Sequence, residues 1–355
     1  MNLTAYIPTF HFGYLLSFIL LACQTRKQTI SEDLFKSADQ HNVLLDTLIV
    51  DNVPVGITRS ILSASDGSLW FATFNGLVKK DQSGFQNELV GFSDARYFSA
   101  WADSKNRLWF GTIGDGVFCQ ENGQVSQWTT KDGLLNNEVP WIYEDQQGYI
   151  WFGVNGGLSR YDGSSFKNYR MDQDTIFEVP AGLVIENLSR PMQEVNAIAE
   201  DKYGQLWIGT RNSMFLFDGT HFQLVRHGAN TFENVRSIIE DKRGAIWFGG
   251  NAGLWKYDES GYQQLSSNFT GFIFEDSKGN IWTSSETNTG WAIGYYASKN
   301  LLKFNYKFHS VHDEEPMIFG IGEDISGKIW AGTLNGVFNW SGERLTFYTL
   351  PLVYQ

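Results

Sequence analysis

The sequence is poor in basic residues, and this shortage excludes one class of partner. Its 355 residues include 27 Lys and Arg against 39 Asp and Glu, which gives a formal net charge of −12. Proteins that bind nucleic acid need clustered basic residues to displace counterions from the phosphates. We therefore expect no nucleic-acid partner. The same electrostatics disfavour direct binding to an anionic membrane surface.

Cysteine, proline and recognisable catalytic motifs are also scarce. Two cysteines, Cys23 and Cys119, are too few for a disulfide framework, and Cys119 is predicted to be a lone buried thiol. Seven prolines against 36 glycines favour many tight turns over a disordered linker. No Gly-x-Ser-x-Gly, His-Glu-x-x-His or phosphate-loop pattern occurs. The sequence thus predicts no catalytic residue, no metal site and no cofactor, and it favours a non-enzymatic protein.

The apolar run at residues 10–22, FHFGYLLSFILLA, is short. Its 13 residues fall below the roughly 20 that span a bilayer and are typical of a signal peptide. Residues 1–22 contain neither Lys nor Arg, which signal peptides normally carry near their start. The following segment, Leu20-Leu21-Ala22-Cys23, resembles a bacterial lipobox. The resemblance implies that Cys23 becomes the first mature residue and carries a diacylglycerol on its thiol.

The alternatives for this terminus are an uncleaved short anchor or an ordinary signal peptide, and each predicts export. We predict a lipoprotein signal peptide over 1–22, a polar tether over 23–44 and a globular region over 45–355. The lipobox resemblance implies the periplasm or outer membrane of a Gram-negative bacterium, with membrane attachment through the lipid alone.

The globular region contains a repeat of about forty residues with the pattern Asp-x-x-Gly-x-(Ile/Leu)-Trp. The pattern contributes one tryptophan in each of seven copies. In six copies an aspartate stands six residues before that tryptophan, and in the first copy Ala64 stands there instead. Glycine stands three residues before the tryptophan in all repeats except the second, which has Asn106. Since this turn needs a left-handed backbone, asparagine is among the best-tolerated substitutes. The repeat tryptophans are Trp70, Trp109, Trp151, Trp207, Trp247, Trp282 and Trp330.

Four short segments that are typical of strands accompany each turn: an apolar one before the aspartate and three more after it, the fourth being a segment such as SFKNYR or HFQLVR. Four strands in a period of about forty residues predict one blade of a β-propeller. The fold class is therefore all-β, a seven-bladed β-propeller of four-stranded antiparallel blades, with the tryptophan packing between blades. Residues 170–194 form an insertion expected to project from the rim between the third and fourth blades. Whether 45–50 pairs with the last blade stays open.

The fullest copies, EDQQGYIWFGVNGGL at 144–158 and EDKRGAIWFGGNAGL at 240–254, resemble the two-component regulator propeller repeat. The resemblance covers all seven blades, and the sixth, IWTSSETNTGW, departs from it most. It implies a ligand-binding sensor domain outside the cytoplasm. In that family a membrane helix and a kinase usually follow, but this sequence has no pattern for either. We therefore expect any signal to be transmitted by a separate partner.

The candidate binding residues lie in the loops of one face. We expect the Asp-x-x-Gly turns, with their Glu-Asp pairs, to have a structural role on the opposite face. Propeller ligands usually meet the loops before the first strand and after the second. In this sequence those loops contain Arg96, Tyr97, Asp115, Trp141, Asn155, Arg211, Asn212, Arg236, Asn251 and Asn335. Amide, guanidinium and aromatic groups together suit a polar ligand such as a glycan or a peptide, although the asparagines also suit tight turns.

Two other functions stay open. Streptogramin-lyase-type enzymes are also seven-bladed propellers, and a metal-dependent lyase would need a histidine beside a carboxylate on one face. His227 and His309 are its candidates. The second alternative is a scaffold that binds an envelope protein and no sugar.

Overall fold

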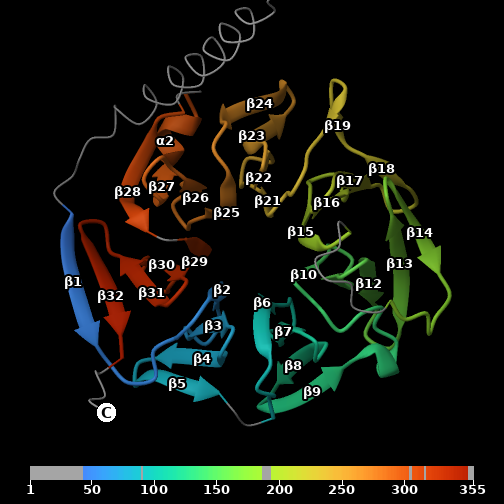
Figure 1. The fold of residues 1–355 in the computed structure, drawn as a ribbon, viewed down its shortest axis with the longest axis horizontal. Coiled ribbons are helices and arrows are strands. Elements are labelled where there is room, and N and C mark those ends of the chain that lie inside the picture. Colours follow the sequence, from blue (N-terminus) through green and yellow to red (C-terminus); the bar gives the residue numbers. More distant parts are fainter. Residues whose placement is uncertain (1–42, 89–90, 186–192, 304–305, 316, 351–355) are drawn as a thin grey trace, which may run out of the picture. The chain divides into compact units, whose positions relative to one another are not determined.

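The computed structural model describes residues 43–88, 91–185, 193–303, 306–315 and 317–350. The predicted signal peptide, Cys23 and tether residues 24–42 lie outside these ranges. Within them, seven antiparallel sheets stand around a common axis, each with its first strand innermost (Figure 1). The prediction of a seven-bladed β-propeller is confirmed.

Blades 1 to 3 come from the first half of the chain. Blade 1 consists of β2 (Thr58–Ser63), β3 (Leu69–Thr73), β4 (Gly76–Asp81) and β5 (Gly84–Glu88). Blade 2 consists of β6 (Arg96–Ala102), β7 (Leu108–Ile113), β8 (Val117–Glu121) and β9 (Gln124–Trp128), and the short helix η1 (Thr130–Asp132) follows it. Blade 3 consists of β10 (Trp141–Glu144), β11 (Ile150–Val154), β12 (Gly157–Tyr161), β13 (Phe166–Asp172) and β14 (Thr175–Val179).

Blades 4 and 5 are separated by a two-stranded hairpin. Blade 4 consists of β15 (Val195–Glu200), β16 (Leu206–Thr210), β17 (Met214–Phe217) and β18 (Phe222–Leu224). The hairpin consists of β19 (Arg226–His227) and β20 (Asn230–Thr231). Blade 5 consists of β21 (Ser237–Glu240), β22 (Ile246–Gly250), β23 (Gly253–Asp258) and β24 (Gly261–Ser266).

Blades 6 and 7 complete the ring. Blade 6 consists of β25 (Thr270–Glu275), β26 (Ile281–Glu286), β27 (Trp291–Tyr296) and β28 (Phe308–Glu315), with helix α2 (Ser298–Leu301) before its last strand. Blade 7 consists of β29 (Ile318–Glu323), β30 (Ile329–Thr333), β31 (Gly336–Trp340) and β32 (Arg344–Thr349), and the N-terminal strand β1 (Leu44–Ile49) joins its outer edge.

Pairing of β1 with β32 closes the ring. The two strands run parallel from Leu44 opposite Arg344 to Ile49 opposite Thr349, and Figure 1 shows them side by side. The Arg344 guanidinium also forms an ion pair with Asp46. The chain then continues from β1 into blade 1, so the hydrogen bonds of β1 hold the start of blade 1 to the outer edge of blade 7. This answers the question that the sequence left open at 45–50.

The repeat aspartate has two acceptor roles in one turn. In six blades its Oδ1 accepts the backbone N–H groups two and four residues later. Its Oδ2 accepts the indole N–H of the tryptophan six residues later, at 2.7–2.9 Å. The turn glycines have φ near +80°, and Asn106 has φ +61°, as predicted. The six-residue spacing therefore places the indole on the carboxylate.

The glutamate before that aspartate acts between blades rather than within the turn. Glu144 accepts the backbone N–H of Ser104 in the preceding blade at 2.6 Å, and its other oxygen accepts the Ser104 hydroxyl at 2.7 Å. Equivalent backbone bonds occur at the next four interfaces. These carboxylates are the inter-blade glutamates: Glu144, Glu200, Glu240, Glu275 and Glu323. The structural role expected for the Glu-Asp pairs is thus carried by two different contacts.

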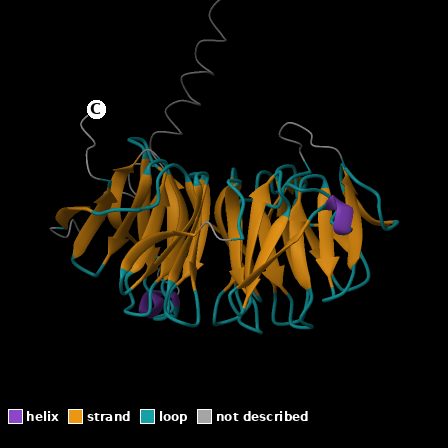
Figure 2. Ribbon diagram, turned by 90° about the horizontal axis from the view of Figure 1, so that it is seen from below, coloured by secondary structure: helices purple, strands orange, loops and turns teal. Residues whose placement is uncertain are grey.

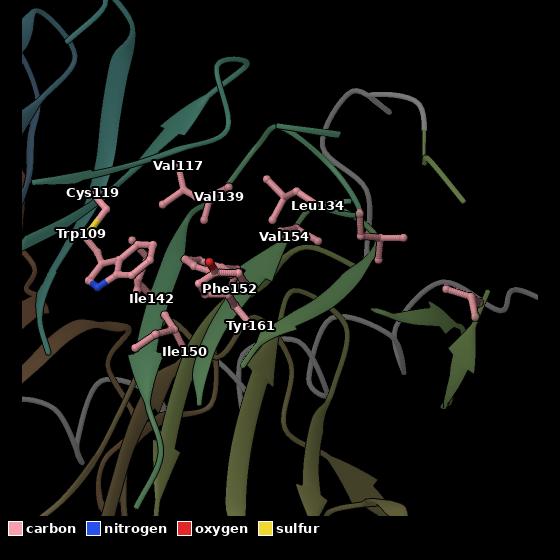
Figure 3. Close-up of a cluster of buried hydrophobic side chains, with 12 residues drawn as sticks. Trp109, Val117, Cys119, Leu134, Val139, Ile142, Ile150, Phe152, Val154 and Tyr161 are labelled. Atoms are coloured by element: carbon pink, nitrogen blue, oxygen red, sulfur yellow. The ribbon is translucent and has the colours of Figure 1, made fainter. Parts of the chain in front are cut away.

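The repeat tryptophans pack between blades, as predicted. The Trp109 ring in blade 2 lies 5.7 Å from Phe152 and 6.1 Å from Tyr161 in blade 3. Figure 3 shows Trp109 with Cys119 in this cluster of buried side chains. Cys119 is free, and burial raises the pKa of its thiol to about 12. It is therefore a packing residue.

The insertion at 170–194 begins as regular structure. Its first part completes β13 and turns back as β14, which adds a fifth strand to blade 3. The chain then returns to the loops of that blade, where the Ile185 N–H donates to the Leu135 carbonyl at 3.1 Å. Residues 186–192 lie outside the described ranges.

Candidate functional site

In several blades, an irregularity in the innermost strand leaves one channel-lining residue out of the ladder. In β2 the pairing with β3 passes from Thr58 directly to Ser60, so Arg59 is left out of the ladder. The same shift leaves out Phe98 in β6, Asn196 in β15 and Gly271 in β25. A β-bulge of this kind turns the extra residue away from the ladder and often lies beside a binding site.

The residues so displaced share one position in the repeat, five before the aspartate or its equivalent Ala64. All seven residues at this position line one cavity of about 330 Å³. We call this set the channel ring: Arg59, Phe98, Pro140, Asn196, Arg236, Gly271 and Phe319. Because each innermost strand begins at the loop face and ends at the Asp-x-x-Gly turn, the ring lies toward the loop face of the propeller. Figure 2 shows the loops gathered on the two opposite faces, with the strands between them.

The rest of the cavity lining is mainly apolar and aromatic. Closer to the Asp-x-x-Gly turns it includes Leu62, Trp101, Ile239 and Phe274. Toward the loops it is bordered by Phe269 and Trp291, whose rings meet edge to face at 5.6 Å. Binding pockets for small molecules typically combine such apolar walls with a few placed polar groups.

Two arginines supply the charge of the channel ring. The Arg59 guanidinium lies 4.0 Å from the ring centre of Phe98 and 5.1 Å from that of Phe319. Desolvation lowers the pKa of Arg59 to about 9, and repulsion from Arg236 adds to this. Desolvation also lowers the pKa of Arg236, whose Nη1 donates to Asn196 Oδ1 at 3.3 Å. Both guanidinium groups remain protonated at neutral pH.

Of the residues predicted from the sequence, Trp141 and Arg236 line the cavity. The Trp141 indole Nε1 donates to the Ile198 carbonyl of the next blade at 3.1 Å, which fixes the ring orientation. Tyr97 is fully buried in the core, and its hydroxyl donates to the Ser93 carbonyl at 3.1 Å. Burial raises the pKa of Tyr97 to about 12. It is therefore placed for packing rather than for contact with a ligand.

Three other predicted residues surround the loop face without lining the cavity. Arg96 is exposed, with its guanidinium 5.9 Å from the Phe74 ring. Arg211 forms an ion pair with Glu194. The backbone of Asp115 bonds to Thr112 Oγ1 and to the Gln127 amide, which makes it part of a turn.

The predicted asparagines hold loops together. Asn155 Nδ2 donates to Glu138 at 2.8 Å, and Asn251 Oδ1 accepts from Asn234 at 2.8 Å. The backbone N–H groups of Asn212 and Asn335 donate to the threonines two residues earlier. These contacts match the tight-turn role that the sequence also allowed.

The sequence interpretation missed Arg59, Phe98, Asn196 and Phe319, because it considered loops and these residues belong to strands. A signal was available. When the blades are aligned on the aspartate, the position five residues earlier varies between Arg, Phe, Pro, Asn and Gly, whereas the turn itself is almost constant. A strand position whose residue type differs from blade to blade does not take part in the packing that all blades share, so it is a candidate for contact with a ligand.

The two histidines of the lyase alternative lie on outer strands. His227 belongs to β19 and packs 5.1 Å from Trp255, and His309 belongs to β28 and stacks 5.2 Å from Tyr295. Neither lines the channel cavity. Within the described ranges, no group of three or more His, Cys, Asp or Glu is placed to hold a metal.

A family model for the two component regulator propeller matches residues 133–156, 189–212 and 231–252. These segments include the first two strands of blades 3, 4 and 5. They are two-component regulator propeller repeats. In each of them the repeat contributes one residue to the channel ring, namely Pro140, Asn196 and Arg236.

Solved structures with low sequence identity share the fold. The extracellular domain of a putative hybrid two-component system from B. thetaiotaomicron is 22% identical, with a TM-score of 0.64. The match covers 84% of this chain but 41% of that one, so the repeats span about two fifths of its length. No curated protein matches the sequence significantly.

Two further propellers share the fold at lower sequence identity. Virginiamycin B lyase from Staphylococcus aureus, crystallised as an inactive variant with quinupristin, is 15% identical, with a TM-score of 0.60 over 82% of this chain and 97% of that one. PorZ, a surface component of the type-IX secretion system of Porphyromonas gingivalis, is 15% identical, with a TM-score of 0.56 over 82% and 48%. At such identities the likeness concerns the fold alone. No helix among the described residues is both long and apolar enough to cross a membrane.

Proposed function

We propose that this chain is a non-enzymatic, exported propeller that binds a ligand in the mouth of its central channel. The channel ring carries the proposal. Its residues differ in chemistry from blade to blade, while the Asp, Gly and Trp of the same repeats build the blades. Bulges place several of them in the channel, where apolar walls surround a cavity of ligand size.

The proposal extends to location and to signalling. The lipobox-like segment ending at Cys23 supports export and a lipid anchor in the periplasm or outer membrane. The two-component regulator propeller repeats, together with the likeness to an extracellular domain of a hybrid two-component system, support a sensor-like role. In that role a separate envelope protein transmits the signal.

The test is a screen of oligosaccharides and peptides against the purified protein, followed by thermal shift and tryptophan fluorescence. The key variant is Gly271→Phe, because Gly271 lines the cavity and the atoms nearest to a Cβ there belong to the side chains of Trp291, at 3.0 Å, and Phe269, at 3.5 Å, so the added ring displaces the Trp291 ring and fills the channel. We expect at least tenfold weaker binding. Tyr203→Ala is the control, since Tyr203 is 71% exposed on the Asp-x-x-Gly face.

A second variant guards against misfolding of the first. Phe319→Trp places a fluorescent side chain in the channel ring, and its emission should change when ligand binds. Binding that is unaffected by Gly271→Phe, with no emission change from Trp at 319, would place the ligand elsewhere. Retention of an envelope protein with no small ligand would favour the scaffold alternative.

A further inference from the structure

We infer that the channel ring selects a carboxylate-bearing ligand of about disaccharide or dipeptide size, with Arg59 and Arg236 binding the acid group. The inference rests on the proposed function, because it names the class of ligand for the same channel. Three observations carry it: an arginine without a carboxylate partner, a local excess of positive charge, and aromatic walls beside both.

Arg59 has no anionic partner of its own. Among the described residues, no carboxylate lies within ion-pair distance of its guanidinium, and no side chain or carbonyl accepts a hydrogen bond from it. Its contacts are the rings of Phe98 and Phe319 on the two neighbouring blades. These rings hold the guanidinium plane through cation–π contacts and leave its N–H groups available to a ligand.

The surroundings of the two arginines carry surplus positive charge. Glu194 is the carboxylate that acts on both Arg59 and Arg236, but it forms its ion pair with Arg211. Arg59 and Arg236 thus repel each other, while the carboxylate that attracts both of them is already paired with a third arginine. The whole chain has a net charge of −12, so this excess is local and runs against the overall charge. An anion entering the channel relieves the repulsion.

Arg59 and Arg236 line the same cavity, so both can act on an acid group bound there. Arg59 comes from blade 1 and Arg236 from blade 5 of a seven-bladed ring, so they approach the channel from different sides. Guanidinium groups bind carboxylates through paired N–H donors, and they do so most strongly where water is excluded. Asn196 bonds to Arg236 and fixes its orientation.

The walls define the remainder of the ligand. Phe98, Trp141, Phe272 and Phe319 offer ring faces and edges on which a sugar or aromatic ring can pack. The cavity of about 330 Å³ lies at the small end of ligand pockets, which limits the occupant to one or two such rings. A ligand with a carboxylate on a compact, partly apolar body fits both the two arginines and the small aromatic cavity.

The experiment compares matched ligands that differ only in charge, titrated calorimetrically into the full chain. One pair is a uronic-acid disaccharide and its methyl ester, and the other is an N-acetylated aromatic dipeptide and its C-terminal amide. Sodium benzoate is the smallest acidic probe. We expect the acidic member of one pair to bind at least tenfold more tightly than its neutral partner, and which pair responds distinguishes a sugar acid from a peptide acid.

The arginine variants test the assignment of the acid group. Arg59→Gln and Arg236→Gln should each lower the affinity for the acidic ligands at least tenfold. The affinity for the neutral ligands should stay unchanged. Arg226→Gln is the matched control, because Arg226 is half-exposed on β19, outside the channel ring. Without ligand, Arg236→Gln should raise the Tm, since it removes one of two repelling charges and retains a partner for Asn196.

The outcomes separate this inference from the proposed function. Equal binding of acidic and neutral members, abolished by Gly271→Phe, would keep the channel as the binding site and overturn the acid specificity. An unchanged affinity in both arginine variants, or a lower Tm for unliganded Arg236→Gln, would overturn it as well. Absence of acid-dependent binding to every probe, benzoate included, would also count against it.

Discussion

Trp70 is the repeat tryptophan of blade 1, and the residue six positions before it is Ala64, where the other six blades have an aspartate. Its indole N–H is buried and has no hydrogen-bond partner among the described residues. The six other indoles each donate to a carboxylate. Blade 1 also lacks an inter-blade glutamate on either side, because Ser63 and Ala102 stand at those positions. Both interfaces of blade 1 therefore lack the glutamate contact that the other five interfaces have.

Restoring the aspartate should stabilise the protein. In Ala64→Asp the new carboxylate can accept the Trp70 indole N–H, and a buried donor without a partner costs about 1–3 kcal/mol. The backbone turn is already formed, since the Gly67 N–H donates to the Ala64 carbonyl at 2.9 Å. We expect the free energy of unfolding in urea to rise by about 1–2 kcal/mol. In a Trp70→Phe background the same substitution should give no gain, and an equal gain there would contradict the indole bond.

The inter-blade glutamates predict a pH dependence. Burial raises the pKa of Glu200, Glu240 and Glu275 above the ordinary 4.5, and neighbouring carboxylates add to this. Between 4.5 and the native pKa the folded protein binds more protons than the unfolded chain. Their contribution to the free energy of unfolding therefore falls as pH rises through this window.

Replacing all three by glutamine removes the titration while an amide oxygen can still accept the backbone N–H. The triple variant should gain stability relative to the wild type as pH rises from about 4.5 toward neutrality, measured by urea unfolding at several pH values. The control is the double variant Glu121→Gln, Glu286→Gln, because both side chains are exposed. It should leave the pH dependence of the unfolding free energy unchanged. A stability difference independent of pH would show that these carboxyls do not titrate differently in the folded state.

Ring closure by β1 can be tested with proline. The backbone N–H groups of Leu44 and Val50 both donate to carbonyl groups of the last blade. Because N–H groups alternate in direction along a strand, the Leu48 N–H also points toward β32, and the Thr47 N–H points away from it. Leu48→Pro should cost about 1–3 kcal/mol of unfolding free energy by removing a donor. Thr47→Pro should cost less. Similar losses from both would indicate that β1 does not close the ring through this register.

The lipid anchor predicted at Cys23 has a direct test. Wild-type protein expressed in a Gram-negative host should incorporate radiolabelled palmitate and sediment with membranes. Cys23→Ser should lose both the label and the membrane association. Cys119→Ser is the control, because Cys119 is buried and free. Label retained in Cys23→Ser would exclude the lipobox assignment.

Local chemistry explains why the blades could be predicted. Each turn repeats an aspartate, a glycine and a tryptophan at fixed spacing, and the contacts among them form within seven residues. The exception at Asn106 could be interpreted for the same reason, since its backbone requirement is local. The absence of the aspartate in blade 1 is also visible in the sequence, as Ala64, although its consequence for the Trp70 indole N–H appears only in the structure.

The sequence by itself determined the number of blades, the turn chemistry and the packing role of the tryptophans, because these depend on residues close together in the chain. Only the tertiary structure decided which residues face the channel. The bulge at Arg59 is a matter of pairing between strands, and Arg59 and Arg236 line one cavity because β1 and β32 close the ring. Long-range register and closure are properties of the whole fold, and no local pattern specifies them.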